Sequence, residues 1–128
     1  MNPRIGAALA AIGISLGTLS GAVIAHDATP AQYGGIVQTA SDLQFELVEK
    51  DGRVSLHVDD HGRKKAVAGA SGKLTVLDGA SKSETTLQPA QDNVLVAADK
   101  IALARGAKAV AKVTFADGKT VTVRFVVK

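Results

Sequence analysis

The chain has 128 residues, a formal charge of +3 and no cysteine. This length suggests one domain, and the lack of cysteine excludes disulfides, thiolate metal ligands and a cysteine nucleophile. The weak positive charge is spread along the chain, and only four residues are aromatic. Both features argue against nucleic-acid binding, which needs basic residues gathered on one face and aromatic rings on which bases stack.

Residues 1–25 have the features of a secretory signal peptide. One positive charge, on Arg4, precedes an uncharged stretch that ends in Val23-Ile24-Ala25, a combination that a signal peptidase accepts. We predict cleavage after Ala25, which leaves a periplasmic protein that begins at His26. This mature chain carries 14 basic and 12 acidic residues.

A retained membrane anchor is the alternative for the same segment. Its 21 uncharged residues are long enough to cross a bilayer, and three glycines have the spacing of closely packed transmembrane helices: Gly13, Gly17 and Gly21. Against an anchor, the stretch is only mildly apolar, and no cluster of Lys or Arg follows it as a stop-transfer signal. We therefore expect no membrane contact after cleavage.

Apolar and polar residues alternate with a period of two along most of the mature chain, which predicts strands. Turn-forming pairs such as Asp51-Gly52 and Asp117-Gly118 separate the runs. We predict an all-β domain over residues 36–128, a small antiparallel β-sandwich that is Ig-like or barrel-like. About seven strands are expected. The clear runs are 43–48, 54–59, 73–76, 94–96, 109–115 and 121–127, while 81–84 is either a polar loop or the start of an edge strand.

The stretch from His57 to Gly62 contains two histidines and two aspartates. On a strand, His57 and Asp59 share the outward face because Val58 belongs to the inward set, and His61 joins them if the strand continues. Imidazole and carboxylate groups on one face suit copper, zinc or nickel ions. The alternative is a solvated strand end, since the basic residues at 63–65 would pair with the aspartates and repel a cation.

Cleavage after Ala25 gives His26 a free α-amine, and the amine and imidazole of one residue can chelate copper together. Residues 26–35 contain Pro30 and two glycines, so we expect a flexible arm that can fold back toward the strand. The predicted metal ligands, with copper or zinc as the ion, are His26, His57, Asp59 and His61. The alternative is that His26 is merely the first exposed residue.

Motifs of catalysis do not occur in the sequence. The serines show no G-x-S-x-G pattern, and neither H-E-x-x-H nor a glycine-rich phosphate loop is present. Asp59 and Asp60 are adjacent, so on a strand they face opposite ways and cannot act as an acid/base pair. Glu46, Glu49 and Lys50 are expected on an exposed strand face. We predict that the protein is not an enzyme.

Five segments carry a likeness to known proteins: YGG (33–35), LQFELV (43–48), VDDHG (58–62), VAGASGKLTVL (67–77) and AKAVAKVTF (107–115). Together they resemble a family of small periplasmic proteins associated with heavy-metal and copper efflux, related to a module of metal-efflux periplasmic adaptors. The resemblance implies a β-sandwich-like module that handles copper or another divalent metal. Where relatives have histidine, this chain has Tyr33 and Gln44, so only His26 and His61 remain as ligands by analogy.

These observations favour a non-enzymatic periplasmic accessory or binding protein, with weak divalent metal binding linked to metal efflux. The expected partner is an envelope or efflux-system protein. The alternative is a metal-free structural or protein-interaction β-domain, which pairs with an envelope partner through an exposed strand edge.

Overall fold

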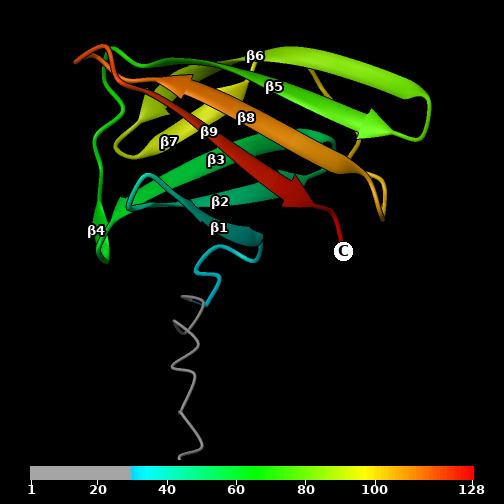
Figure 1. Cartoon of the computed structure of the whole chain (residues 1–128), viewed down its shortest axis with the longest axis horizontal. Coiled ribbons are helices and arrows are strands. Elements are labelled where there is room, and N and C mark those ends of the chain that lie inside the picture. The colour runs from blue at the N-terminus through cyan, green and yellow to red at the C-terminus, as the bar shows by residue number, and fades with distance from the viewer. Residues whose placement is uncertain (1–29) are drawn as a thin grey trace, which may run out of the picture.

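The computed structural model describes residues 30–128, which form nine β-strands (Figure 1). Their bounds are β1 (Ile36–Ala40), β2 (Leu43–Lys50), β3 (Arg53–Asp60), β4 (Arg63–Lys64), β5 (Ser71–Asp78), β6 (Ser81–Gln91), β7 (Val94–Ala97), β8 (Lys108–Thr114) and β9 (Thr120–Val126). Within this range, no helix has the length and hydropathy that crossing a membrane requires. The predicted signal peptide and residues 26–29 of the predicted arm lie outside the described residues.

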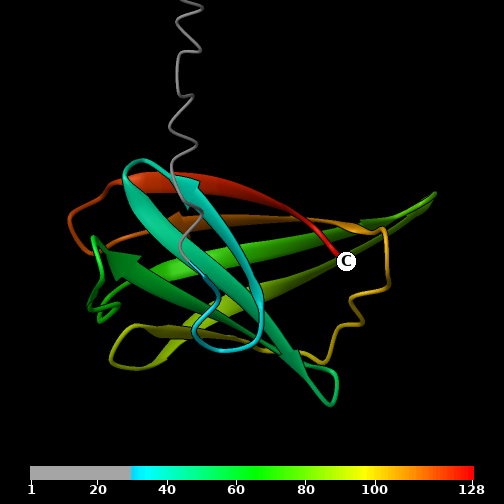
Figure 2. The ribbon, with the colours of Figure 1, turned by 90° about the horizontal axis from the view of Figure 1, so that it is seen from below.

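All nine strands belong to one antiparallel sheet that curls until it nearly closes into a barrel (Figures 1 and 2). The strand order is β1-β2-β3-β7-β6-β5-β8-β9, and β4 pairs with the end of β3. The two ends of this order, β1 and β9, lie next to each other but do not pair by hydrogen bonds. An open seam therefore remains between them.

The prediction of an all-β antiparallel domain is confirmed, in its barrel-like form. The expected number of strands is too low, because β4 consists of two charged residues and β1 contains only two large apolar residues, Ile36 and Val37. Residues 81–84, expected as a loop or an edge, belong to β6, a strand of 11 residues inside the sheet. The alternating pattern that would predict β6 from the sequence is weak, because only Thr85 and Leu87 of this strand are buried.

Tight turns join consecutive strands where the sequence predicts them. Asp51 and Gly52, between β2 and β3, have φ angles of 53° and 79°. Two consecutive positive φ angles give the hairpin turn whose twist matches that of the strands, and glycine adopts the second at no steric cost. The turn sets the register in which Glu46 lies opposite His57. The predicted turn at residues 117–118 likewise joins β8 and β9.

Aliphatic and phenylalanine side chains fill the inside of the barrel. In β9 the buried residues alternate with exposed ones, as the period-two pattern predicts. Phe45, Leu56 and Leu95 are fully buried, and they come from three neighbouring strands, β2, β3 and β7. The apolar residues thus account for the inner face, while the outer face carries the polar and charged side chains.

Replacing Leu95 with alanine tests this division of faces. Because the side chain is fully buried, we expect Leu95→Ala to lower the free energy of unfolding by about 2–5 kcal/mol. The matched control is Leu77→Ala, since Leu77 points outward from β5 and is 38% exposed; its loss is expected to stay below about 1 kcal/mol. Chemical denaturation measures both, and equal losses would contradict the assignment of faces.

Candidate functional site

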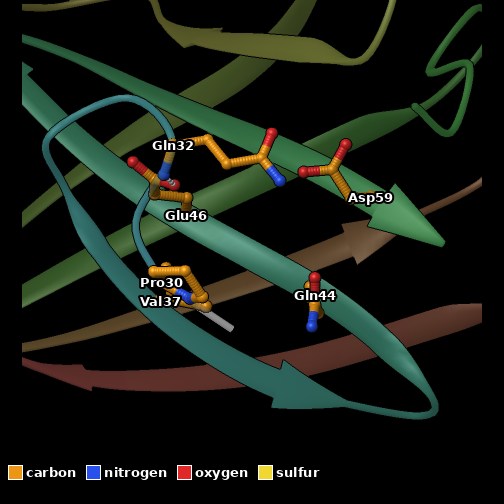
Figure 3. A pocket seen from close by; sticks show the side chains of 6 residues that line it. All are labelled: Pro30, Gln32, Val37, Gln44, Glu46 and Asp59. Atoms are coloured by element: carbon orange, nitrogen blue, oxygen red, sulfur yellow. Dashed lines mark hydrogen bonds between the residues drawn. The ribbon is translucent and has the colours of Figure 1, made fainter. Parts of the chain in front are cut away.

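A group of ionisable and polar side chains lies on the outer face of β2 and β3. Glu46 is opposite His57, and Gln44 is opposite Asp59, so their side chains form one polar group. Residues 30–35, which we call the covering segment, run over this group (Figure 3). A small pocket under the segment is lined by Pro30, Gln32, Val37, Gln44, Glu46 and Asp59.

Glu46 fastens the covering segment to the sheet. The residue is only 4% exposed, and its carboxylate accepts hydrogen bonds from three backbone N–H groups. Oε1 accepts from Gln32 at 2.7 Å, and Oε2 accepts from Tyr33 at 2.7 Å and from Gly35 at 3.0 Å. A carboxylate that is removed from water requires such partners, and bonds to an ionised acceptor are roughly twice as strong as neutral ones.

Gly35 is the point at which the covering segment comes closest to β2. A Cβ atom at this position would lie 2.2 Å from the carbonyl oxygen of Leu47, which is a severe overlap. Any other residue would therefore push the segment away from the sheet. Residues 30–35 of the predicted flexible arm are thus held in place by one carboxylate and one close backbone approach.

Tyr33 stacks its ring on the imidazole of His57. The ring centroids are 3.8 Å apart, and the planes differ by 15°. Nε2 of His57 lies 3.4 Å from Oγ of Ser55, whereas Nδ1 is buried without a hydrogen-bond partner among residues 30–128. Burial holds the pKa of His57 below its ordinary value of 6.5, although the carboxylates of Glu46 and Asp59 favour the protonated form.

Asp59 is buried beside Asn93 rather than solvated at a strand end. Asn93 is 1% exposed, and its Nδ2 donates to the carbonyl oxygen of Val58 at 3.1 Å and to Oδ1 of Asp59 at 3.3 Å. The backbone N–H of Val58 in turn donates to the carbonyl of Asn93 at 2.9 Å. Asp59 and Asn93 therefore tie the end of β3 to the start of β7.

His61 does not share the face of His57 and Asp59. β3 ends at Asp60, and His61 lies in the following turn with a φ of 49°. Its Nδ1 is 2.5 Å from Oδ1 of Asp60, and both side chains are largely exposed. The condition under which His61 would join the other two, a strand that continues to residue 61, is therefore not met, because the chain turns there to form β4. The fourth predicted ligand, His26, lies outside the described residues.

The described members of the predicted metal set have separate surroundings in the structure. His57 is enclosed by Tyr33, Asp59 is bonded to Asn93, and His61 is in a turn beyond the strand. Among residues 30–128, no three His, Asp or Glu side chains lie close enough to hold a metal together. Metal ligation by His26, His57, Asp59 and His61 stays a prediction from the sequence.

The sequence did not indicate the structural roles of three residues at this face: Tyr33, Glu46 and Asn93. Glu46 was expected on an exposed strand face, and that expectation is wrong because the covering segment buries it. Alternation places a residue on one side of a sheet, but it does not say whether another segment covers that side. The available signal was a Gly-Gly pair next to a tyrosine shortly before the strand.

Comparison with known proteins adds no relative: no protein-family model, no curated protein and no solved structure matches this chain. The resemblance to metal-efflux proteins therefore stays a prediction from the sequence, and the function is inferred from the geometry.

Removing the charge of Glu46 tests the fastening of the covering segment. In Glu46→Gln the new amide N–H₂ faces backbone N–H donors, so at least one of the three hydrogen bonds is lost. We expect the free energy of unfolding to fall by about 1–3 kcal/mol. Glu49→Gln, an exposed change on the same strand, is the control and should stay within about 0.5 kcal/mol. Equal effects in thermal or chemical denaturation would contradict this role of Glu46.

His57 makes the stability depend on pH. Because its pKa is lower in the folded protein than in the unfolded chain, the unfolded chain takes up the proton more readily. The contribution of His57 is fully present above pH 6.5 and is lost as the pH falls from there through the folded pKa. We expect His57→Gln to flatten the decrease in unfolding free energy between about pH 7 and about pH 5. Identical pH profiles in the two proteins would rule out this role.

Titration with Cu(II) and Zn(II) separates the metal hypothesis from the observed geometry. A metal ion that bound all four predicted ligands would raise the melting temperature, and His57→Gln and His61→Gln would each abolish the rise. Since the imidazole of His57 is enclosed by Tyr33 and the sheet, we expect any rise to be the same in the natural protein and in His57→Gln. A rise that needs both histidines would show that the metal set assembles after all.

Proposed function

We propose that this chain is a non-enzymatic protein-interaction domain of the cell envelope, which binds an extended segment of another envelope protein along the seam between β1 and β9. The observation that carries this proposal is the incomplete closure of the sheet. β1 and β9 are its two end strands, and each has a hydrogen-bonded neighbour on one side only. The predicted signal peptide supports a place in the envelope.

Unpaired strand edges are unusual features that proteins tend to protect. The outer backbone groups of β1 and β9 form no strand pair within residues 30–128, although the two strands lie side by side. An extended peptide satisfies such groups by adding a strand, and its side chains then provide specificity. β9 has seven residues, which is enough for this mode of recognition.

A shallow pocket opens at the seam and joins both end strands. It is lined by Gln38 of β1, by Arg124, Phe125 and Val126 of β9, and by Leu77, Lys108, Ala109 and Val110 from the strands beyond. Gln38 belongs to the set of β1 residues that face the barrel interior, yet it is exposed because no strand covers the seam. A segment bound at the seam would therefore contact Gln38 on one side and Val126 on the other.

The polar groups on the outer face of β2 and β3 serve the fold, which supports a non-enzymatic role. Glu46 holds the covering segment, Asp59 is bonded to Asn93, and His57 lies under Tyr33. A general acid or base must reach a substrate. These three side chains are instead committed to contacts within the chain.

Photo-cross-linking in the cells that produce the protein tests the proposal. A photoreactive residue at position 38, in the seam, should give one discrete cross-linked protein. The same residue at position 96 is the control, because Val96 is also exposed but lies on β7, inside the sheet. Hydrogen exchange of the complex made from the two purified proteins should then show slower exchange of β1 and β9 amides. Equal cross-linking at both positions, or protection confined to other strands, would contradict strand pairing at the seam.

A further inference from the structure

We infer that the segment bound at the seam is acidic, with carboxylates that contact a triangle of unpaired cations on β8 and β9. This inference rests on the proposed function and names the chemistry of its partner. The cations are Lys108, Lys112 and Arg124, which point outward next to the free edge of β9.

Strand pairing gathers basic residues that are far apart in the sequence. β6, β5, β8 and β9 are consecutive in the sheet, and the outward positions of these four strands carry five cations: Lys73, Lys82, Lys108, Lys112 and Arg124. Glu84 is the one carboxylate at the outward positions of the same strands. The charge that is evenly spread along the chain is therefore concentrated on one outer face, which we call the basic face.

Glu84 neutralises only the part of the basic face that lies away from the seam. Its carboxylate is 2.8 Å from Nζ of Lys73 and 3.2 Å from Nζ of Lys82. Hydrogen bonds from these two lysines hold the pKa of Glu84 below its ordinary value. Glu84 therefore stays ionised and paired with Lys73 and Lys82. No carboxylate among residues 30–128 pairs with the three cations on β8 and β9.

Register brings these three cations together. Arg124 is opposite Val110, so it lies diagonally between Lys108 and Lys112 of the neighbouring strand. Diagonal neighbours in an antiparallel pair are about 7–8 Å apart, a distance at which like charges repel each other. A bound carboxylate would relieve this repulsion, so the triangle favours an anionic ligand.

Two exposed aliphatic residues flank the cations and indicate a protein ligand. Lys108 is opposite Val126 on one side and opposite Leu77 on the other. Val126 is 55% exposed and Leu77 is 38% exposed, and they are two of the three large apolar residues exposed within residues 30–128. A peptide that pairs with β9 can place an apolar side chain beside Val126 and, two residues further along the same face, a carboxylate beside Arg124. An anionic lipid would leave the backbone edge of β9 unsatisfied.

Synthetic peptides of about ten residues, the length of a long strand, test the inference on the full mature protein. One peptide repeats Val-Thr-Glu-Thr, so that valine and glutamate alternate along one face of the strand, and the control has glutamine in place of glutamate. We expect the glutamate peptide to bind at least about tenfold more tightly at low salt, and to lose this advantage in 1 M salt, where charges are screened within about 3 Å. NMR should show shifts of Lys108, Lys112 and Arg124 signals together with β9 amides.

Charge reversal on the protein gives the matched variants. Lys108→Glu combined with Arg124→Glu should weaken binding of the glutamate peptide by about tenfold or more. Lys50→Glu combined with Arg53→Glu, exposed cations at the distant hairpin of β2 and β3, should leave it unchanged. Equal weakening by both pairs would overturn the inference, because it would show that only net charge matters.

The remaining outcomes separate the two proposals. Equal binding of both peptides, with slower exchange of β9 amides, would overturn the acidic ligand and leave strand pairing at the seam intact. Tight binding of the glutamate peptide without protection of β1 or β9 would keep the acidic ligand and overturn strand pairing. Binding of phosphatidylglycerol vesicles in preference to either peptide, lost in the Lys108/Arg124 variant, would overturn both. Failure of the glutamate peptide to bind would overturn the acidic ligand.

Discussion

A single buried carboxylate holds the covering segment against the outer face of the sheet. Glu46 accepts three backbone hydrogen bonds from the covering segment, and the close approach at Gly35 leaves no room for a side chain between segment and sheet. Tyr33 belongs to the same segment, and its ring stacks on His57. The outer face of β2 and β3 is therefore partly covered, with Glu46 and Asp59 buried in it, and its polar groups contact residues of the same chain.

The seam between β1 and β9, which we propose as the surface for interactions, borders this covered face, because β1 pairs with β2. The sheet order ends at β1 and β9, which lie next to each other without pairing. The exposed aliphatic residues Leu77 and Val126 and the unpaired cations of β8 and β9 lie next to this seam. The covering segment that Glu46 fastens leads directly into β1, so the same hydrogen bonds hold the start of one edge of the seam in place.

The inner face of the domain could be predicted from the sequence, whereas the outer face could not. Alternation in residues 121–127 marks the buried side of β9, and Asp51-Gly52 marks the turn after β2. The burial of Glu46 depends on a segment that reaches it across more than ten positions of sequence, so no local pattern contains it. The basic face likewise depends on register, which brings Lys108 of β8 next to Leu77 of β5 and Val126 of β9. His61 would have joined His57 on one face only if the strand had continued, and the strand ends one residue earlier.

Amide hydrogen exchange at Gln32, Tyr33 and Gly35 measures directly whether Glu46 holds the covering segment, because these N–H groups donate the three hydrogen bonds that its carboxylate accepts. In the natural protein we predict that the three amides exchange far more slowly than the same residues in an unstructured chain. In Glu46→Gln their exchange should accelerate together, while the amides in the middle of β2 and β3 stay protected. Exchange of the three amides at the rate of an unstructured chain in the natural protein would show that Glu46 does not hold the covering segment.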